Sequence, residues 1–214
     1  MTIKVGPEVP RRGNWFSRFL GLAALRIMGW KLEGEVPNLP KMVMIGAPHT
    51  SNTDGVIALL TLTALGLNAG TMIKDSAFKG VMGVILRWFG ALSVDRNSPK
   101  GVVEQSIDAF KSREKFLLLI APEGTRSAPS AWKRGFYHVA VAANVPVLPA
   151  ACNYKTKRIT LGPPFYPKDG FEADFPELLA FFRDHSAPCH PEGLSKPLCE
   201  AQGIPWTPKA TQKD

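Results

Sequence analysis

His49 and Asp54 have the chemistry of a proton-transfer pair and lie five positions apart in the stretch GAPHTSNTDGV. A carboxylate that holds one ring nitrogen of a histidine orients the ring and makes the other nitrogen a better proton acceptor. Five positions on a regular helix turn the chain by about 500°, which would leave the two side chains roughly 140° apart. They meet only if His49 stays in a loop and a residue among 50–52 caps a helix whose first turn holds Asp54. The pair is therefore either a general base or a capped helix start without catalytic function.

A second polar group follows the most apolar run of the chain, KFLLLIAP at residues 115–122. Its members are Glu123, Gly124, Thr125 and Arg126. Glycine lets the backbone approach a ligand closely, and the planar guanidinium group of arginine matches the oxygens of a phosphate. The group therefore predicts a phosphate-binding loop, with an ordinary turn that carries a surface salt bridge as the alternative.

Further cations follow neighbouring apolar runs. Arg96 lies in VDRNS at residues 94–98, and Lys133 and Arg134 precede a predicted helix. Cations near a helix N-terminus oppose the helix dipole, so a bound anion would explain them. We therefore add Arg96 and Lys133 to the predicted phosphate site.

Other site classes lack their usual patterns. The chain contains no G-x-S-x-G, no G-x4-G-K-[ST] and no G-x-G-x-x-G, the patterns of serine hydrolases, nucleotide hydrolases and dinucleotide enzymes. A metal site is not expected, because His49 has no second histidine or cysteine at ligand spacing. Four further candidates are irregularly spaced in the tail: His185, Cys189, His190 and Cys199.

Apolar runs that alternate with helical segments must position these polar groups. We expect strands at residues 42–47, 71–74, 91–94, 115–122 and 145–152, with a possible edge strand at 158–165. We expect helices at residues 56–67, 78–89, 98–113 and 134–144. This alternation predicts an α/β layered domain with a largely parallel or mixed central sheet flanked by helices. The polar groups should then gather beyond the carboxyl ends of the strands.

The composition fits one domain with appendages. The chain has 214 residues, 45% of them hydrophobic, enough for one substantial core. We predict an N-terminal membrane-interface segment at 1–35, the α/β domain at 36–185 and an irregular tail at 186–214. The net charge of +8 favours an anionic partner, and the three unevenly spaced cysteines suit a reducing compartment.

The stretch from Trp15 to Trp30 is the most apolar segment near the N-terminus. It carries Arg18 and Arg26 and has only about sixteen residues, whereas a membrane-spanning helix needs about twenty with few charges. We therefore predict an amphipathic helix that lies in the membrane interface. The alternative is a helix packed on the domain's own core.

Four motifs together resemble the glycerolipid acyltransferase family, which includes the lysophosphatidate acyltransferases. They are PHTSNTD, GALSVDR, APEGTRS and VPVLPA, and the resemblance runs from about Lys41 to Ala151. It implies that His49 is the general base and Asp54 its orienting partner. It also implies that Arg96 and residues 123–126 bind the phosphate of the acceptor and that Pro146 and Pro149 belong to the acyl-donor side.

The expected reaction follows from this resemblance. His49 would take a proton from the free hydroxyl of a lyso-lipid, and the alkoxide would attack the thioester of acyl-CoA or acyl-carrier protein without a cofactor. Backbone amides at the start of the helix after His49 would hold the oxyanion. We expect a cytoplasmic protein held peripherally on the anionic inner face of the cell membrane, without a nucleic-acid partner. The alternative function is a non-catalytic lipid- or phosphate-binding protein of the same fold.

Overall fold

The structure is a computed structural model that describes residues 3–74, 79–80, 83, 92–94 and 101–208. Its centre is a seven-stranded sheet in the order β1-β7-β6-β2-β5-β3-β4. The strands are β1 (Lys31–Gly34), β2 (Lys41–Ala47), β3 (Ala69–Lys74), β4 (Leu92–Val94), β5 (Phe116–Ile120), β6 (Val147–Asn153) and β7 (Arg158–Leu161). The helices are α1 (Trp15–Ile27), α2 (Asn52–Leu65), α4 (Val102–Lys111), α5 (Gly135–Ala143), α6 (Phe171–His185) and α7 (Lys196–Ala201), with a 3₁₀ turn, η2, at Pro191–Gly193. The predicted helix at 78–89 lies largely outside the described residues, and Arg96 lies wholly outside them.

The sheet is mostly parallel, as predicted. β2 pairs in parallel with both β5 and β6, β3 with β4 and β5, and β1 with β7, whereas β6 and β7 are antiparallel. The carboxyl ends of β2, β5 and β6 therefore lie side by side at one edge of the sheet. The loops that carry His49 and residues 123–126 leave the sheet there.

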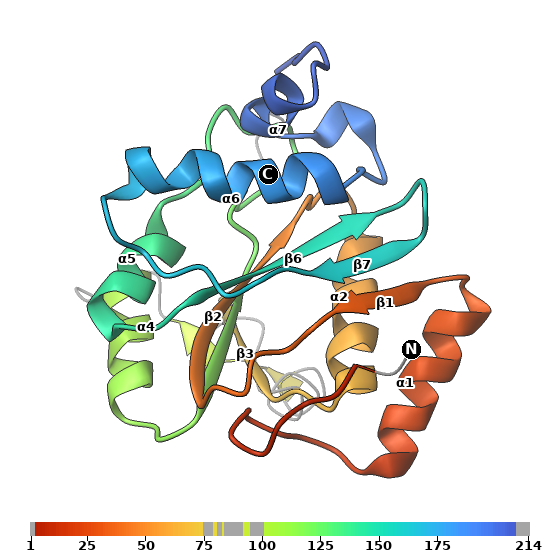
Figure 1. Ribbon diagram of the computed structural model, residues 1–214, viewed down its shortest axis with the longest axis vertical. Coiled ribbons are helices and arrows are strands. Elements are labelled where there is room, and N and C mark those ends of the chain that lie inside the picture. The colour runs from red at the N-terminus through yellow and green to blue at the C-terminus, as the bar shows by residue number, and fades with distance from the viewer. Residues whose placement is uncertain (1–2, 75–78, 81–82, 84–91, 95–100, 209–214) are drawn as a thin grey trace.

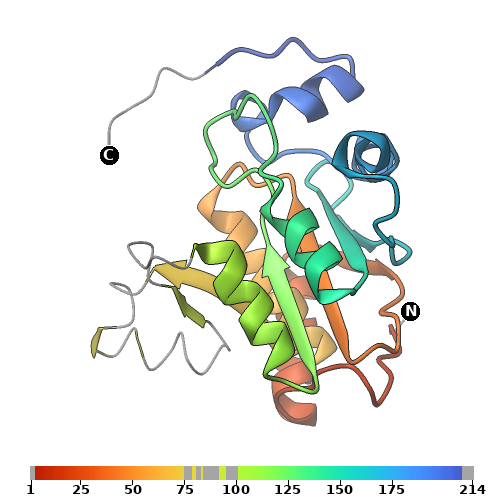
Figure 2. The ribbon, with the colours of Figure 1, turned by 90° about the vertical axis from the view of Figure 1, so that its left-hand side faces the viewer.

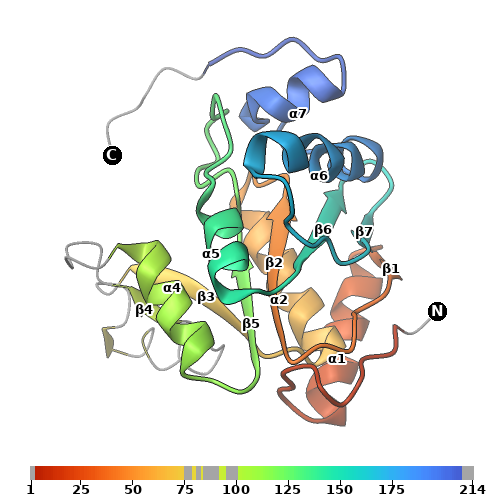
Figure 3. The same ribbon diagram turned by 60° about the vertical axis from the view of Figure 1, so that its left-hand side comes forward.

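Helices cover both faces of the sheet, which gives three layers (Figures 1, 2 and 3). Side chains alternate along β2, so Val43 and Ile45 face α4, α5 and α6, whereas Met42 and Met44 face α2. Both sets are at most 4% exposed. Because β2 is buried on both faces, its sequence is a continuous apolar run, and this run is what predicted the strand.

The structure differs from the sequence-based expectations at the outer strands. The segment predicted as a possible edge strand becomes β7, which lies between β1 and β6. Its prolines, Pro163 and Pro164, follow the last residue of the strand and so remove no hydrogen-bond donor from it. β1 was not expected, because four residues of mixed polarity give little periodicity.

Within residues 186–208, the described part of the tail, regular and well-packed elements correct the prediction of an irregular tail. It contains η2 and α7, and Leu194, Leu198 and Cys199 are at most 2% exposed in the same cluster as α5 and α6. α6 was also not predicted, because Pro176 lies inside it. Burial of an apolar helix face outweighs the cost of one proline.

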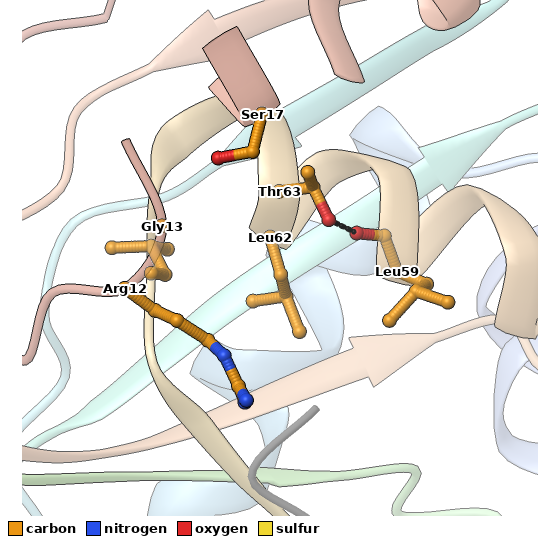
Figure 4. A pocket seen from close by; sticks show the side chains of 7 residues that line it. Arg12, Gly13, Ser17, Leu59, Leu62 and Thr63 are labelled. Carbon is orange, nitrogen blue, oxygen red and sulfur yellow. Dashed lines mark hydrogen bonds between the residues drawn. The ribbon is translucent and has the colours of Figure 1, made fainter. Parts of the chain in front are cut away.

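The alternative interpretation of the Trp15 to Trp30 segment, a helix packed on the domain's own core, describes the inner side of α1. Gly21 and Leu25 are buried against α2, and a β-carbon built on Gly21 would lie 2.7 Å from the backbone nitrogen of Ala64. The preceding segment is also docked, with Arg12 and Gly13 beside Leu62 of α2 (Figure 4). α1 is therefore part of the folded domain. Among the described residues, no helix combines the length and the hydrophobicity needed to cross a bilayer.

Candidate active site

The His49–Asp54 pair forms through the loop-to-helix bend that the spacing requires. His49 lies in the loop after β2, and Ser51 caps α2 by accepting a hydrogen bond from the amide of Asp54. The Asp54 carboxylate in turn accepts a hydrogen bond from the amide of Ser51, which completes a capping box. Nδ1 of His49 then lies 3.5 Å from Oδ2 of Asp54. The capped helix start and the oriented histidine are the same structure.

The Asp54 carboxylate is surrounded by donors. Oδ2 accepts from the amides of Thr50 at 2.6 Å and Ser51 at 2.8 Å, and Oδ1 accepts from the Ser51 hydroxyl at 2.8 Å and the Tyr154 hydroxyl at 2.5 Å. Burial alone raises the pKa of Asp54, but the bonds from His49, Tyr154 and Ser51 outweigh it and lower the pKa to about 2. Asp54 is therefore a fixed negative charge beside His49.

Glu123 lies behind the histidine, away from the residues that line the site cavity. Its Oε2 accepts the backbone N–H of His49 at 2.5 Å, and its side chain is 1% exposed. Burial raises the pKa of Glu123, and the bonds from His49 and the nearby Ser195 only partly offset this rise. The position corrects the assignment of Glu123 to the acceptor-phosphate site, because a buried carboxylate that holds the loop cannot also contact a phosphate.

Several backbone amides near the start of α2 already donate hydrogen bonds within the site. The amide of His49 donates to Glu123, and the amides of Thr50 and Ser51 donate to Asp54. The amide of Asp54 donates to Ser51. These four groups organise the pair, which restricts the expected oxyanion donors to the other amides at the start of α2.

Arg126 is a predicted phosphate-site residue that lines the cavity together with the pair. Its side chain is exposed, donates to the side-chain oxygen of Asn52 and lines the same cavity as His49 and Asp54. Gly124 has a positive φ of 66°, and the side chain of Lys133 lies against it. Thr125 also lines the cavity. The loop after β5 therefore brings Arg126 to the start of α2 and Thr125 to the cavity wall, and Lys133 lies against Gly124 of the same loop.

A cavity of about 840 Å³ connects the pair to the apolar interior. At one end lie His49, Asp54 and Arg126, and the remaining wall follows α2, a helix about 20 Å long, to Leu65 and Leu67. The other wall residues come from the sheet: Met44, Thr71, Leu119, Cys152, Ile159 and Leu161. The site thus combines a polar mouth with a long apolar extension.

The structure does not bring every predicted residue to this cavity. Pro146 precedes β6 and its carbonyl accepts from Val43, while Pro149 lies within β6 opposite Ile45. Both prolines are buried in the sheet and do not line the cavity, so the structure does not place them on its acyl-donor side.

The sequence did not predict two residues that are distant in the chain but lie beside the site in the structure. Tyr154 lies in the turn after β6 and reaches Asp54, and Ser195 lies next to Glu123 and accepts from the indole of Trp132 at 3.0 Å. Neither residue belongs to a recognisable motif. Only the placement of β6 and the tail beside β2 brings them to the site.

The chain is similar to known proteins in fold and in sequence. The crystal structure of the 1-acyl-sn-glycerophosphate acyltransferase PlsC from Thermotoga maritima superposes with a TM-score of 0.55 at 16% identity, covering 90% of this chain and 80% of that one. The likeness shows that the two proteins share a fold.

Curated relatives are closer in sequence. The 1-acyl-sn-glycerol-3-phosphate acyltransferase of Escherichia coli K12 is 34% identical over 164 residues, and that of Salmonella typhimurium LT2 is 27% identical over 165 residues. The matches cover 72% of this chain and 65% of each relative, so the chain spans somewhat less than two thirds of their length. The family model described as Acyltransferase matches residues 32–153, which include the pair, the loop after β5 and most of the cavity wall. The chain belongs to this acyltransferase family.

Proposed function

We propose that this protein transfers a fatty acyl group from an acyl thioester to the free hydroxyl of a lyso-lipid such as 1-acylglycerol 3-phosphate. The observation that carries the proposal is the oriented His49–Asp54 pair at the polar end of a long apolar cavity. A lipid-binding protein needs the cavity but has no use for an oriented base. The curated relatives named above support the same reaction class.

The chemistry starts at the ring nitrogen that faces away from Asp54. Nε2 of His49 takes the proton of the acceptor hydroxyl, and the oxygen attacks the thioester carbonyl. The negative charge of Asp54 stabilises the imidazolium that forms. The tetrahedral intermediate collapses with departure of the thiolate, which takes up the proton from His49. Arg126 supplies positive charge at the same end of the cavity.

Among the described residues, the cysteine in the cavity wall is a poor competing nucleophile. Cys152 is the cysteine that lines the cavity, and burial together with the charge of Asp54 raises the pKa of its thiol. A protonated thiol is a poor nucleophile. Direct attack by the acceptor hydroxyl therefore fits the site better than an acyl-enzyme route.

Each end of the cavity suits one part of the substrates. Arg126 and Lys133 are exposed cations beside the mouth, and they suit the phosphate of an acceptor. The leucines along α2 suit an extended acyl chain, and 840 Å³ lies within the usual range of ligand sites. Product analysis with each donor distinguishes acyl-CoA from acyl-carrier protein.

The outer face of α1 fits a lipid surface. Five large apolar side chains are exposed within about 140° of arc at 100° per residue. They are Trp15 (78%), Phe16 (52%), Phe19 (59%), Leu20 (50%) and Ile27 (86%). Replacing Trp15, Phe19 and Ile27 with serine should release the protein from anionic vesicles in co-sedimentation while α1 stays packed on α2 through Gly21 and Leu25. Unchanged co-sedimentation would contradict a membrane role for this face.

Product analysis by mass spectrometry tests the function. Purified protein is incubated with a panel of phosphorylated and unphosphorylated lyso-lipids, each with acyl-CoA and with acyl-carrier protein. We expect a diacyl product that requires His49, with a rate loss of about 10²- to 10⁴-fold in His49→Ala. His138→Ala is the matched control, since His138 is an exposed histidine on α5.

The same assay separates the alternatives. Substrate binding without any product would favour the lipid-binding function. Product formation that survives His49→Ala would remove the general base. Arg126→Ala should raise KM for phosphorylated acceptors only, and an equal rise for unphosphorylated ones would contradict the phosphate contact.

A further inference from the structure

Tyr154 contacts the proposed catalytic pair from outside the motif that contains it. The residue lies in the turn between β6 and β7, one hundred positions after Asp54, and donates its hydroxyl proton to Oδ1 of Asp54 at 2.5 Å. It is not among the residues that line the cavity. Any effect of Tyr154 on the reaction must therefore pass through Asp54.

The other donors to Asp54 are local. Thr50 and Ser51 belong to the same loop and helix start, so they move together with the carboxylate. Within the described part of the chain, the other donors come from the loop and helix start that hold Asp54, whereas Tyr154 donates to it from another element of the fold. This bond fixes Oδ1 and thereby aims Oδ2 at Nδ1 of His49, which lies 3.5 Å away.

The Tyr154 ring is itself held firmly. Its edge-to-face contact with Trp30 has a centroid separation of 4.9 Å and an interplanar angle of 89°. The ammonium group of Lys157 lies 5.7 Å from the ring centroid, and the backbone amide of Tyr154 donates to the carbonyl of Ala187 at 3.1 Å. Trp30 is 2% exposed and lies shortly after the end of α1 at Ile27. The hydroxyl is therefore presented from a fixed position.

We propose that Tyr154 is a positioning residue for acyl transfer, which holds the Asp54 carboxylate in the orientation that aligns His49. The proposal rests on the proposed function for its kinetic readout. It assigns to the β6–β7 turn a part in catalysis that is separate from substrate binding. The indole of Trp30 supports this turn, so the segment after α1 contributes to the alignment of the pair through Tyr154.

Tyr154→Phe isolates the hydroxyl, because phenylalanine keeps the ring contact with Trp30. We expect kcat to fall by about tenfold, the order found when an outer hydrogen-bond partner of a functional group is removed. KM for both substrates should stay unchanged, since Tyr154 does not line the cavity. The matched control is Tyr137→Phe, which removes a similar buried bond, from Tyr137 to Asp174 at 2.7 Å, away from the site.

Both variants should lose thermal stability, but only Tyr154→Phe should lose kcat. A wild-type kcat in Tyr154→Phe, or an equal loss in Tyr137→Phe, would overturn the proposal. A double-mutant cycle sharpens the test: in an Asp54→Asn background, Tyr154→Phe should lower kcat no further. A full additional loss in that background would show that Tyr154 does not act through Asp54.

A substrate-free measurement keeps this test separate from the proposed function. Nitrogen-15 NMR of the neutral His49 ring should show the proton on Nδ1 in the wild type, where Asp54 accepts it, and a mixture of tautomers in Tyr154→Phe. An unchanged tautomer in the variant would overturn the positioning role. Absence of acyl transfer by the wild-type protein would overturn the proposed function. The NMR comparison would then still test whether Tyr154 positions Asp54.

Discussion

Asp54 and Glu123 are both buried carboxylates that touch His49, yet they lie in opposite electrostatic environments. Asp54 is 8% exposed and accepts four hydrogen bonds besides its contact with the imidazole. Glu123 is 1% exposed and accepts the His49 amide on Oε2, while Oε1 has no partner of standard geometry among the described residues. The pKa of Asp54 is lowered to about 2, and that of Glu123 is raised.

The difference shows that donors, more than burial, decide what a buried carboxylate does. Asp54 stays charged and can stabilise an imidazolium ion. Glu123 loses part of its preference for the charged form and acts mainly as an acceptor that holds the loop of His49. One histidine therefore has an electrostatic partner on its ring and a structural partner on its backbone.

Exchanging each carboxylate for its amide should separate these two roles most strongly. Asp54→Asn removes the charge beside the ring, and we expect kcat to fall by about 10²- to 10⁴-fold. Glu123→Gln keeps an oxygen that accepts the His49 amide, so its loss should be much smaller. Steady-state kinetics of the two variants measure the contrast, and equal losses would contradict the assignment of separate roles.

The stability of the fold in acid should depend on Asp54. Its pKa is about 2 in the native state against an ordinary value of 3.8, so the unfolded chain binds more protons between these values. The stabilisation is fully present above about pH 4 and is lost as the pH falls through about 2. It amounts to about 2 kcal/mol by linkage.

Denaturant unfolding of the wild type and of Asp54→Asn between pH 5 and about pH 2 checks this prediction. The difference in unfolding free energy between the two proteins should shrink as the pH falls. A difference that stays constant over the range would mean that other groups cause the acid sensitivity.

The sequence predicted the residues of the pair better than their surroundings. His49 and Asp54 had to meet through a capped bend, and Ser51 provides that cap. The apolar runs located five strands of the sheet, and burial on both faces explains the clear pattern of β2. β1 and α6 were missed, since the first is short and the second contains Pro176.

The surroundings of the pair depend on tertiary placement and leave no local signal. Glu123 appears beside Arg126 in the sequence, which grouped them as phosphate ligands, but one side chain turns into the protein and the other lines the cavity. Ser195 and Tyr154 come from segments with no motif. The periodicity of apolar residues identifies helices and strands. The direction of a side chain in a loop depends instead on the segments of the fold that pack against that loop.

Ser195→Ala should widen the difference between the pKa values of Glu123 and Asp54. We expect its effect to be the smallest of the three changes. The Trp132 indole loses its buried acceptor, which should cost about 1 kcal/mol of unfolding free energy. Glu123 loses a group that offsets its burial, so its pKa should rise further. A carboxyl with a raised native pKa binds more protons in the folded state, so stability falls as the pH rises above its ordinary value of 4.5.

This fall should be steeper in Ser195→Ala than in the wild type, and unfolding curves from pH 4 to 8 measure it. Glu123→Gln in the same background is the control, because glutamine does not titrate and the added slope should disappear. A slope that persists with glutamine would place the titrating group elsewhere. That result would mean that Ser195, in the tail that packs against Glu123, does not affect the charge state of this carboxylate. The difference between the two carboxylates would then depend on the hydrogen bonds of Asp54 alone.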